Sequence, residues 1–192
     1  MKHCLRKFRI IVSFVLIFNV VFYINLYASQ DAFVYDVQLK NNRDDLIVYF
    51  QIKNAFTDKI SEAVLKGVPA SFSSHIRLVQ VTSNILDTEI ADFKITATLK
   101  YNILKKQFVV LRPWKSEKPF VTDSFEEAKK LMSEVYNLKV LELSNLVKGE
   151  KYKLELKADL DKVTLPLYLH YIFFFVSFWD FETDWNVTKF IY

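Results

Sequence analysis

The stretch KYKLELKADLD, residues 151–161, decides the fold class. Its apolar side chains stand at every second position, with charged side chains between them: Tyr152, Leu154, Leu156, Ala158 and Leu160. Because successive side chains of a strand point to opposite faces, this alternation predicts a strand with one buried and one solvated face. Strands of that kind are typical of antiparallel sheets.

Alternation of the same kind runs through most of the chain on either side. Residues 33–39 and 46–52 are predicted to form a hairpin around a turn at 41–44. Further strands are expected over 70–82, 93–101, 107–111 and 140–147. Residues 113–119 begin and end with proline, so we expect them to form a loop.

A first short helix is predicted over residues 58–66. Thr57 or Asp58 can accept hydrogen bonds from its free N-terminal amides. Gly67 suits the left-handed position that ends a helix, and Pro69 prevents the helix from continuing.

A second short helix is predicted after a capping box, either Asp123 with Glu126 or Ser124 with Glu127. Its apolar positions recur at helical spacing: Phe125, Ala128, Leu131, Met132 and Val135. The expected fold is therefore α+β, a strand-dominated antiparallel sheet of sandwich- or barrel-like form with two short helices.

Residues 1–30 have the pattern of an export segment. The first nine residues carry four cations, and residues 10–28 form an almost unbroken apolar run. Such a run enters a bilayer while its cationic end stays on the cytoplasmic side. We expect a signal peptide over residues 1–29 and one domain over 30–192. The alternative is an uncleaved membrane anchor through residues 10–28, because this run nearly reaches the length of a membrane span.

The formal net charge of +4 comes from this leader. Without its four cations, 22 of the 26 basic residues remain, against 22 acidic ones. A neutral body with interspersed signs has no overall field to attract a polyanion. We therefore expect no nucleic-acid partner.

Few residues have the spacing that catalysis or metal binding requires. The histidines His3, His75 and His170 lack metal-ligand spacing, and Cys4, the only cysteine, lies in the leader. We expect no metal and no cofactor. Two glycines are too few for a phosphate-binding loop or a nucleophile elbow. Ser73 shares a strand face with His75, which leaves a hydrolase as a minor alternative.

The segment 165–181 is very apolar and aromatic. A central strand buried on both faces is the favoured interpretation, and a membrane span or an exposed apolar patch are the alternatives. The carboxylates Asp180, Glu182 and Asp184 follow at every second position. They offer oxygen ligands for a hard cation, but a solvated strand face is the simpler interpretation.

The candidate binding surface consists of four side chains: Trp114, His170, Trp179 and Trp185. Tryptophans act as packing anchors when buried and as recognition elements when exposed. His170 is expected to be a neutral core histidine, with a pocket base as the alternative.

The chain resembles a bacterial family of exported proteins known as domain of unknown function 4390. The resemblance spans about residues 31–190 and is carried by these pieces in order: residues 62–72, the hairpin 97–101 to 107–110, residues 124–128, the strand 152–160, residues 165–167, and Trp179 and Trp185. The resemblance implies an envelope location and a strand-dominated α+β domain. It implies no activity.

These observations lead to one expected function and two alternatives. We expect an exported protein of the bacterial periplasm or of the outer face of the cytoplasmic membrane. It would act there as a non-enzymatic binding or assembly module for an envelope protein or an apolar ligand. The first alternative is a membrane-tethered domain that regulates an envelope or signalling protein, and the second is the hydrolase.

Overall fold

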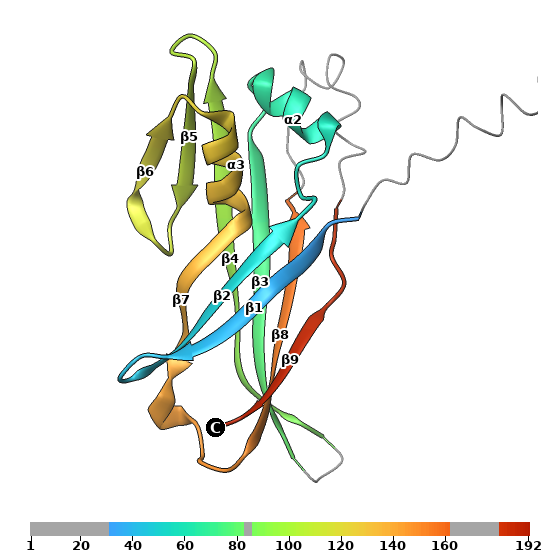
Figure 1. Cartoon of the computed structure of the whole chain (residues 1–192), viewed down its shortest axis with the longest axis vertical. Helices are drawn as coiled ribbons and strands as arrows, with labels where there is room; N and C mark the ends of the chain where they lie inside the picture. The colour runs from blue at the N-terminus through green and yellow to red at the C-terminus, as the bar shows by residue number, and fades with distance from the viewer. Residues whose placement is uncertain (1–30, 83–85, 162–180) are drawn as a thin grey trace, which may run out of the picture. The chain divides into compact units, whose positions relative to one another are not determined.

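The computed structural model describes residues 31–82, 86–161 and 181–192 (Figure 1). The chain divides into two units, Met1–Gln30 and Asp31–Tyr192, and all described residues belong to the second. The predicted leader and all of the apolar segment except Phe181 lie outside the described residues.

The described strands form two antiparallel sheets. The three-stranded sheet has the order β1-β2-β7, and the six-stranded sheet has the order β6-β5-β4-β3-β8-β9. The strands are β1 (Phe33–Asn41), β2 (Asp45–Lys53), β3 (Ala70–Val81), β4 (Thr88–Asn102), β5 (Gln107–Arg112), β6 (Ser116–Thr122), β7 (Glu134–Glu142), β8 (Lys151–Leu160) and β9 (Asn186–Ile191). The helices are α2 (Asp58–Leu65), α3 (Phe125–Ser133) and the short 3-10 helix η1 (Leu143–Asn145).

The prediction of a strand-dominated α+β fold with two short α-helices is confirmed in the described part of the chain. β1 and β2 run diagonally across one face of the six-stranded sheet, which makes the unit sandwich-like (Figure 1). The two sheets are not closed into a barrel, so the sandwich-like form of the prediction is the correct one.

One hydrophobic core lies between the sheets and the helices. β8 contributes the side chains predicted from its alternation, all buried: Tyr152, Leu154, Leu156, Ala158 and Leu160. The even-numbered positions of β3, among them Phe72 and Ile76, face the same core. The other faces of these two strands therefore carry the polar residues.

Both predicted helix starts are confirmed. The Thr57 hydroxyl accepts a hydrogen bond from the Ile60 amide at the start of α2, and the Ser124 hydroxyl accepts one from the Glu127 amide at the start of α3. Gly67 follows α2 with a φ of +86°, a conformation that non-glycine residues rarely adopt. The hydroxyls of Thr57 and Ser124 thus satisfy backbone N–H groups that have no partner within the helices.

The predicted loop at 113–119 is confirmed as a turn at residues 113–115 and is wrong from residue 116 onward. Residues 116–122 form β6, which pairs with β5, and the register shifts between Val110↔Phe120 and Arg112↔Ser116. Pro119 lies in the strand segment where this register is irregular. Proline lacks an N–H group, so strands tolerate it at edges and bulges, and β6 is one of the two edge strands among the described strands of its sheet.

The boundary between α3 and β7 also differs from the prediction. α3 ends at Ser133, so Val135 belongs to β7, and β7 ends at Glu142 rather than at residue 147. Val135 is buried by pairing with Phe50 of β2. Its apolar position fits the period of a helix and of a strand equally, and the pairing with β2 decides between them.

Candidate functional site

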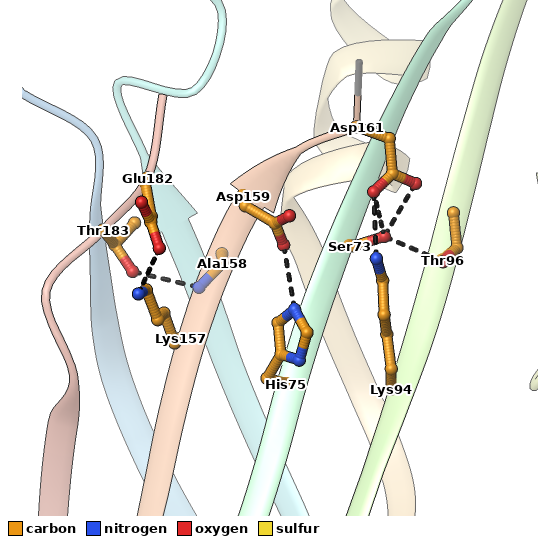
Figure 2. A network of polar contacts seen from close by, with 10 residues as sticks. All are labelled: Ser73, His75, Lys94, Thr96, Lys157, Ala158, Asp159, Asp161, Glu182 and Thr183. Carbon is orange, nitrogen blue, oxygen red and sulfur yellow. Dashed lines mark hydrogen bonds and ion pairs between the residues drawn. The ribbon is translucent and has the colours of Figure 1, made fainter. Parts of the chain in front are cut away.

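Polar side chains cover the face of the six-stranded sheet that points away from the core. We call this surface the polar face, and it consists of Ser73, His75, Arg77, Lys94, Thr96, Glu155, Lys157, Asp159 and Asp161. The register aligns them in rows, because β3 lies between β4 and β8: His75, for example, is opposite Lys94 of β4 and Lys157 of β8. Figure 2 shows the contacts of these residues other than Arg77 and Glu155.

Ser73 connects three strands of the polar face. Its side chain is fully buried, and its hydroxyl lies 2.9 and 2.8 Å from the two carboxylate oxygens of Asp161 (Figure 2). Thr96 Oγ1 lies 2.9 Å from the same hydroxyl, and Lys94 Nζ lies 3.0 Å from Asp161 Oδ1. Because Ser73 has one proton and donates it to Asp161, Thr96 is the donor in the second contact.

His75 faces a different carboxylate. Its Nε2 lies 3.3 Å from Asp159 Oδ1, a contact that becomes an ion pair only when the imidazole is protonated (Figure 2). The geometry falls short of a hydrogen bond, so this buried oxygen of Asp159 has no hydrogen-bond partner. No hydrogen bond joins His75 to Ser73, so the nucleophile–base contact that a serine hydrolase needs is not formed.

Trp185 lies at the edge of the polar face, beside two cations. The Arg77 guanidinium carbon is 4.7 Å from the indole ring centre, and Lys157 Nζ is 5.6 Å from it. Both cations also have carboxylate partners: Arg77 Nη2 lies 2.6 Å from Glu155 Oε2, and Lys157 forms an ion pair with Glu182. The Trp185 ring is therefore held in place although its side chain is 41% exposed.

A local irregularity brings Trp185 to this face. Asp159 is opposite Glu182, and Leu156 is opposite Asn186. The two pairs are three residues apart along β8 but four residues apart along the segment that leads into β9, so this segment contains one extra residue. The extra residue reverses the in–out alternation, as in a β-bulge. A regular strand would place Trp185 on the face opposite to Glu182, but Lys157 contacts both side chains, so Trp185 lies on the same face as Glu182.

The Lys157 ammonium lowers the pKa of Glu182 from its ordinary value, mainly through their hydrogen bond and then through charge attraction.

The Asp159–Glu182 bridge is followed by two contacts between the buried Thr183 and the backbone of Ala158. The Thr183 N–H donates to the Ala158 carbonyl, and the Thr183 hydroxyl accepts from the Ala158 N–H. These contacts fasten the start of the last described segment to β8.

The structure places the predicted binding residues in different regions. Trp114 is half-buried between β5 and β6 and packs against the core, as expected of a packing anchor. Trp185 precedes β9, at the opposite edge of the same sheet. His170, Trp179 and Asp180 lie outside the described residues.

Sequence reasoning identified the charged side chains of β8 on the polar face but not the residues they contact. The alternation in residues 151–161 had identified Glu155, Lys157 and Asp159 as a wet strand face. Their partners Arg77 and His75 stand about 80 positions earlier, and only the β3–β8 register pairs them. Sequence reasoning also predicted no strand at β9, although its residues 187–191, VTKFI, are typical of strands.

In the described residues, no group of three or more histidine, cysteine, aspartate or glutamate side chains is arranged to hold a metal ion. None of the helices in the described ranges combines the length and the apolar character needed to cross a membrane.

Comparison with known proteins gives one match, to a protein family. The family model of "Domain of unknown function (DUF4390)" matches residues 29–189. No curated protein and no solved structure matches the chain. Since the family model covers most of the chain, the protein belongs to the DUF4390 family.

Proposed function

We propose that this member of the DUF4390 family is a non-enzymatic binding or assembly module of the bacterial cell envelope. It recognises an envelope partner through Trp185 and the adjoining edge of the six-stranded sheet. It works in the periplasm or on the outer face of the cytoplasmic membrane, to which residues 1–30 direct it.

The observation that carries this proposal is the held but exposed indole of Trp185. Arg77 and Lys157 fix the ring, so a partner that covers it loses little side-chain entropy on binding. Tryptophan and arginine are also the residues most often found at the energetic centre of interfaces. This combination is typical of a recognition site.

The arrangement of Ser73 supports the non-enzymatic part of the proposal. Its hydroxyl is buried, and its one proton is donated to Asp161. His75 is turned toward Asp159 instead. A carboxylate in contact with the hydroxyl favours a structural hydrogen-bond network over a nucleophile that must meet a substrate.

Site-specific photo-crosslinking in cells tests the binding role. A photoreactive residue at position 187, an exposed position two residues after Trp185, should give one discrete crosslinked product. The same residue at Leu104, which is 96% exposed in the turn between β4 and β5, is the matched control and should give none. Trp185→Ala should remove most of the product, whereas Tyr136→Ala, at an exposed aromatic side chain in the other sheet, should not. Equal labelling from both positions would contradict the proposal.

A reporter enzyme fused after Tyr192 tests the location. A periplasm-dependent reporter should be active, and activity of a cytosol-dependent reporter alone would refute the envelope assignment. Mass spectrometry of the native N-terminus then separates the two forms of the proposal: a chain that begins near Ser29 or Gln30 excludes tethering by residues 10–28.

A further inference from the structure

The two edges of the six-stranded sheet differ in how they are protected. β6 carries Pro119 and an irregular register against β5. β9 pairs with β8 in unbroken register from Leu156↔Asn186 to Lys151↔Ile191. Edge strands without a proline or a bulge are templates for pairing with another strand. β9 is therefore the open edge among the described strands of this sheet.

The backbone of β9 shows which of its groups are free. Tyr192 N donates to the Glu150 carbonyl at 3.2 Å, and Gly149 N donates to the Tyr192 carbonyl at 2.6 Å, so Tyr192 turns its backbone groups toward β8. In an antiparallel pair this direction alternates along the strand. The N–H and C=O groups of Val187, Lys189 and Ile191 therefore point away from β8, and in the described ranges no strand pairs with them.

The side chains along this edge are apolar at both ends and basic in the middle. Val187 is 46% and Ile191 is 66% exposed, and Lys189 lies between them on the same face. Trp185 continues this exposed row toward the polar face. An extended segment that pairs with β9 would cover all of these side chains at once.

Lys189 faces another positive charge and has no acidic side chain beside it in the described part of the chain. It is directly opposite Lys153 on β8, and like charges in that position destabilise a sheet. Asp87 lies 2.6 Å from Lys153 Nζ and raises the pKa of that lysine by its hydrogen bond. Lys189 has no acidic partner among the described residues. An acidic side chain on an added strand would supply one.

A groove lies beside this basic position. Its volume is about 440 Å³, and it is lined by Val81, Lys151, Tyr152, Lys153, Lys189, Phe190 and Ile191. Val81 and Ile191 contribute apolar side chains to its lining, while the three lysines contribute positive charge. The groove has room for a side chain of a segment that lies along β9.

From these observations we propose that β9 binds an extended, acidic segment of a partner protein by strand addition. The segment places an acidic residue opposite Lys189 and apolar residues opposite Val187 and Ile191. This inference rests on the proposed function and gives its partner a chemical class.

Peptide binding to the purified full chain tests the inference. The probe is fluorescein-labelled Thr-Val-Thr-Glu-Thr-Val-Thr, measured by fluorescence anisotropy against the same peptide with lysine in place of glutamate. The acidic peptide should bind at least about threefold more tightly, because opposite charges across a strand pair favour pairing and like charges oppose it. Lys189→Glu should reverse this order. Lys118→Glu, at an exposed lysine on the β6 edge, is the matched control and should leave it unchanged.

Backbone methylation separates strand addition from simple charge attraction. Two versions of the acidic peptide carry N-methyl groups on opposite sets of alternate amides. Only one set faces β9 in an added strand, so one version should lose binding and the other should retain it.

Three results would overturn strand addition: no binding of either peptide, equal binding of the two methylated versions, or a charge preference that Lys189→Glu does not reverse. The crosslinking experiment at position 187 still decides the proposed function in each case. A crosslinked product together with any of these results would leave a binding module that does not use the β9 backbone.

Discussion

The two faces of strand β3 differ in composition and in role. One face carries Phe72, Ile76 and Leu78, all buried in the core. The other carries Ser73, His75 and Arg77, each engaged by a carboxylate of the neighbouring strand or its extension. Apolar burial holds the sandwich together, whereas the polar contacts arrange one surface. We therefore expect the two faces to differ in how much stability a substitution removes.

Ile76→Ala should have the largest effect. Ile76 is fully buried between β4 and β8, so the truncation leaves a cavity in the core. The free energy of unfolding should fall by about 2–5 kcal/mol in chemical denaturation. Arg77→Ala, one residue further along the same strand, is the matched control and should cost less than half as much. Equal losses would remove the distinction between the two faces.

Ser73→Ala should have the next largest effect, because Ser73 is the one fully buried member of the polar face. The loss removes the contacts to Asp161 and Thr96, and the free energy of unfolding should fall by about 1–2 kcal/mol. Ser71→Ala is the control, since Ser71 is half-buried and its hydroxyl contacts Thr98 Oγ1 alone among the described residues, at 2.9 Å. If Ser71→Ala were the more harmful change, Ser73 would not be the centre of the network.

A double-mutant cycle measures the Arg77–Glu155 pair. Glu155 is only 14% exposed and two guanidinium nitrogens of Arg77 contact it, so we expect a coupling free energy of about 1 kcal/mol. The pair Lys129–Glu126 on α3, whose glutamate is 81% exposed, should couple by about 0.3–0.5 kcal/mol in the same assay. A coupling of zero for the sheet pair would mean that the cation acts on Trp185 alone.

The smallest effect is expected from pH, through Glu182. Lys157 holds the pKa of the Glu182 carboxyl below its ordinary value of 4.5, so the folded state favours the ionised form. This contribution to stability is present above pH 4.5 and is lost as the pH falls through the lowered pKa. The difference in unfolding midpoint between the protein and Glu182→Gln should therefore shrink on acidification. A difference that grew toward low pH would contradict the lowered pKa.

Elements that depend on local chemistry could be predicted from the sequence. The hairpin of β1 and β2, the caps Thr57 and Ser124, and the alternation of β8 all follow from side-chain period and hydrogen-bonding capacity within a few residues. The boundaries failed at β6 and β7, where pairing with a distant strand decided between two local conformations. Pro119 indicated a loop in the sequence, but it lies in β6, where the edge position of the strand allows a residue without an N–H group.

The candidate site was predictable only in part, for the same reason. Trp185 was singled out because tryptophan is a common recognition residue, but the face it occupies could not be predicted, since the extra residue between Glu182 and Asn186 is visible only against β8. The Ser73–His75 pair was expected from spacing on one strand face. Their separate carboxylate partners, Asp161 and Asp159, lie more than 80 positions later in the sequence, so only the strand pairing brings them together.

The amino-acid sequence by itself determined that this protein alternates apolar and polar residues into strands, begins with an apolar cation-headed segment, and belongs to the DUF4390 family. Only the tertiary structure decided which charges meet, which side of the sheet Trp185 occupies and which edge has no partner among the described strands. The physical reason is the range of the interactions. Alternation and caps act over a few residues, whereas register joins Arg77 to Glu155 across 78 positions of the chain.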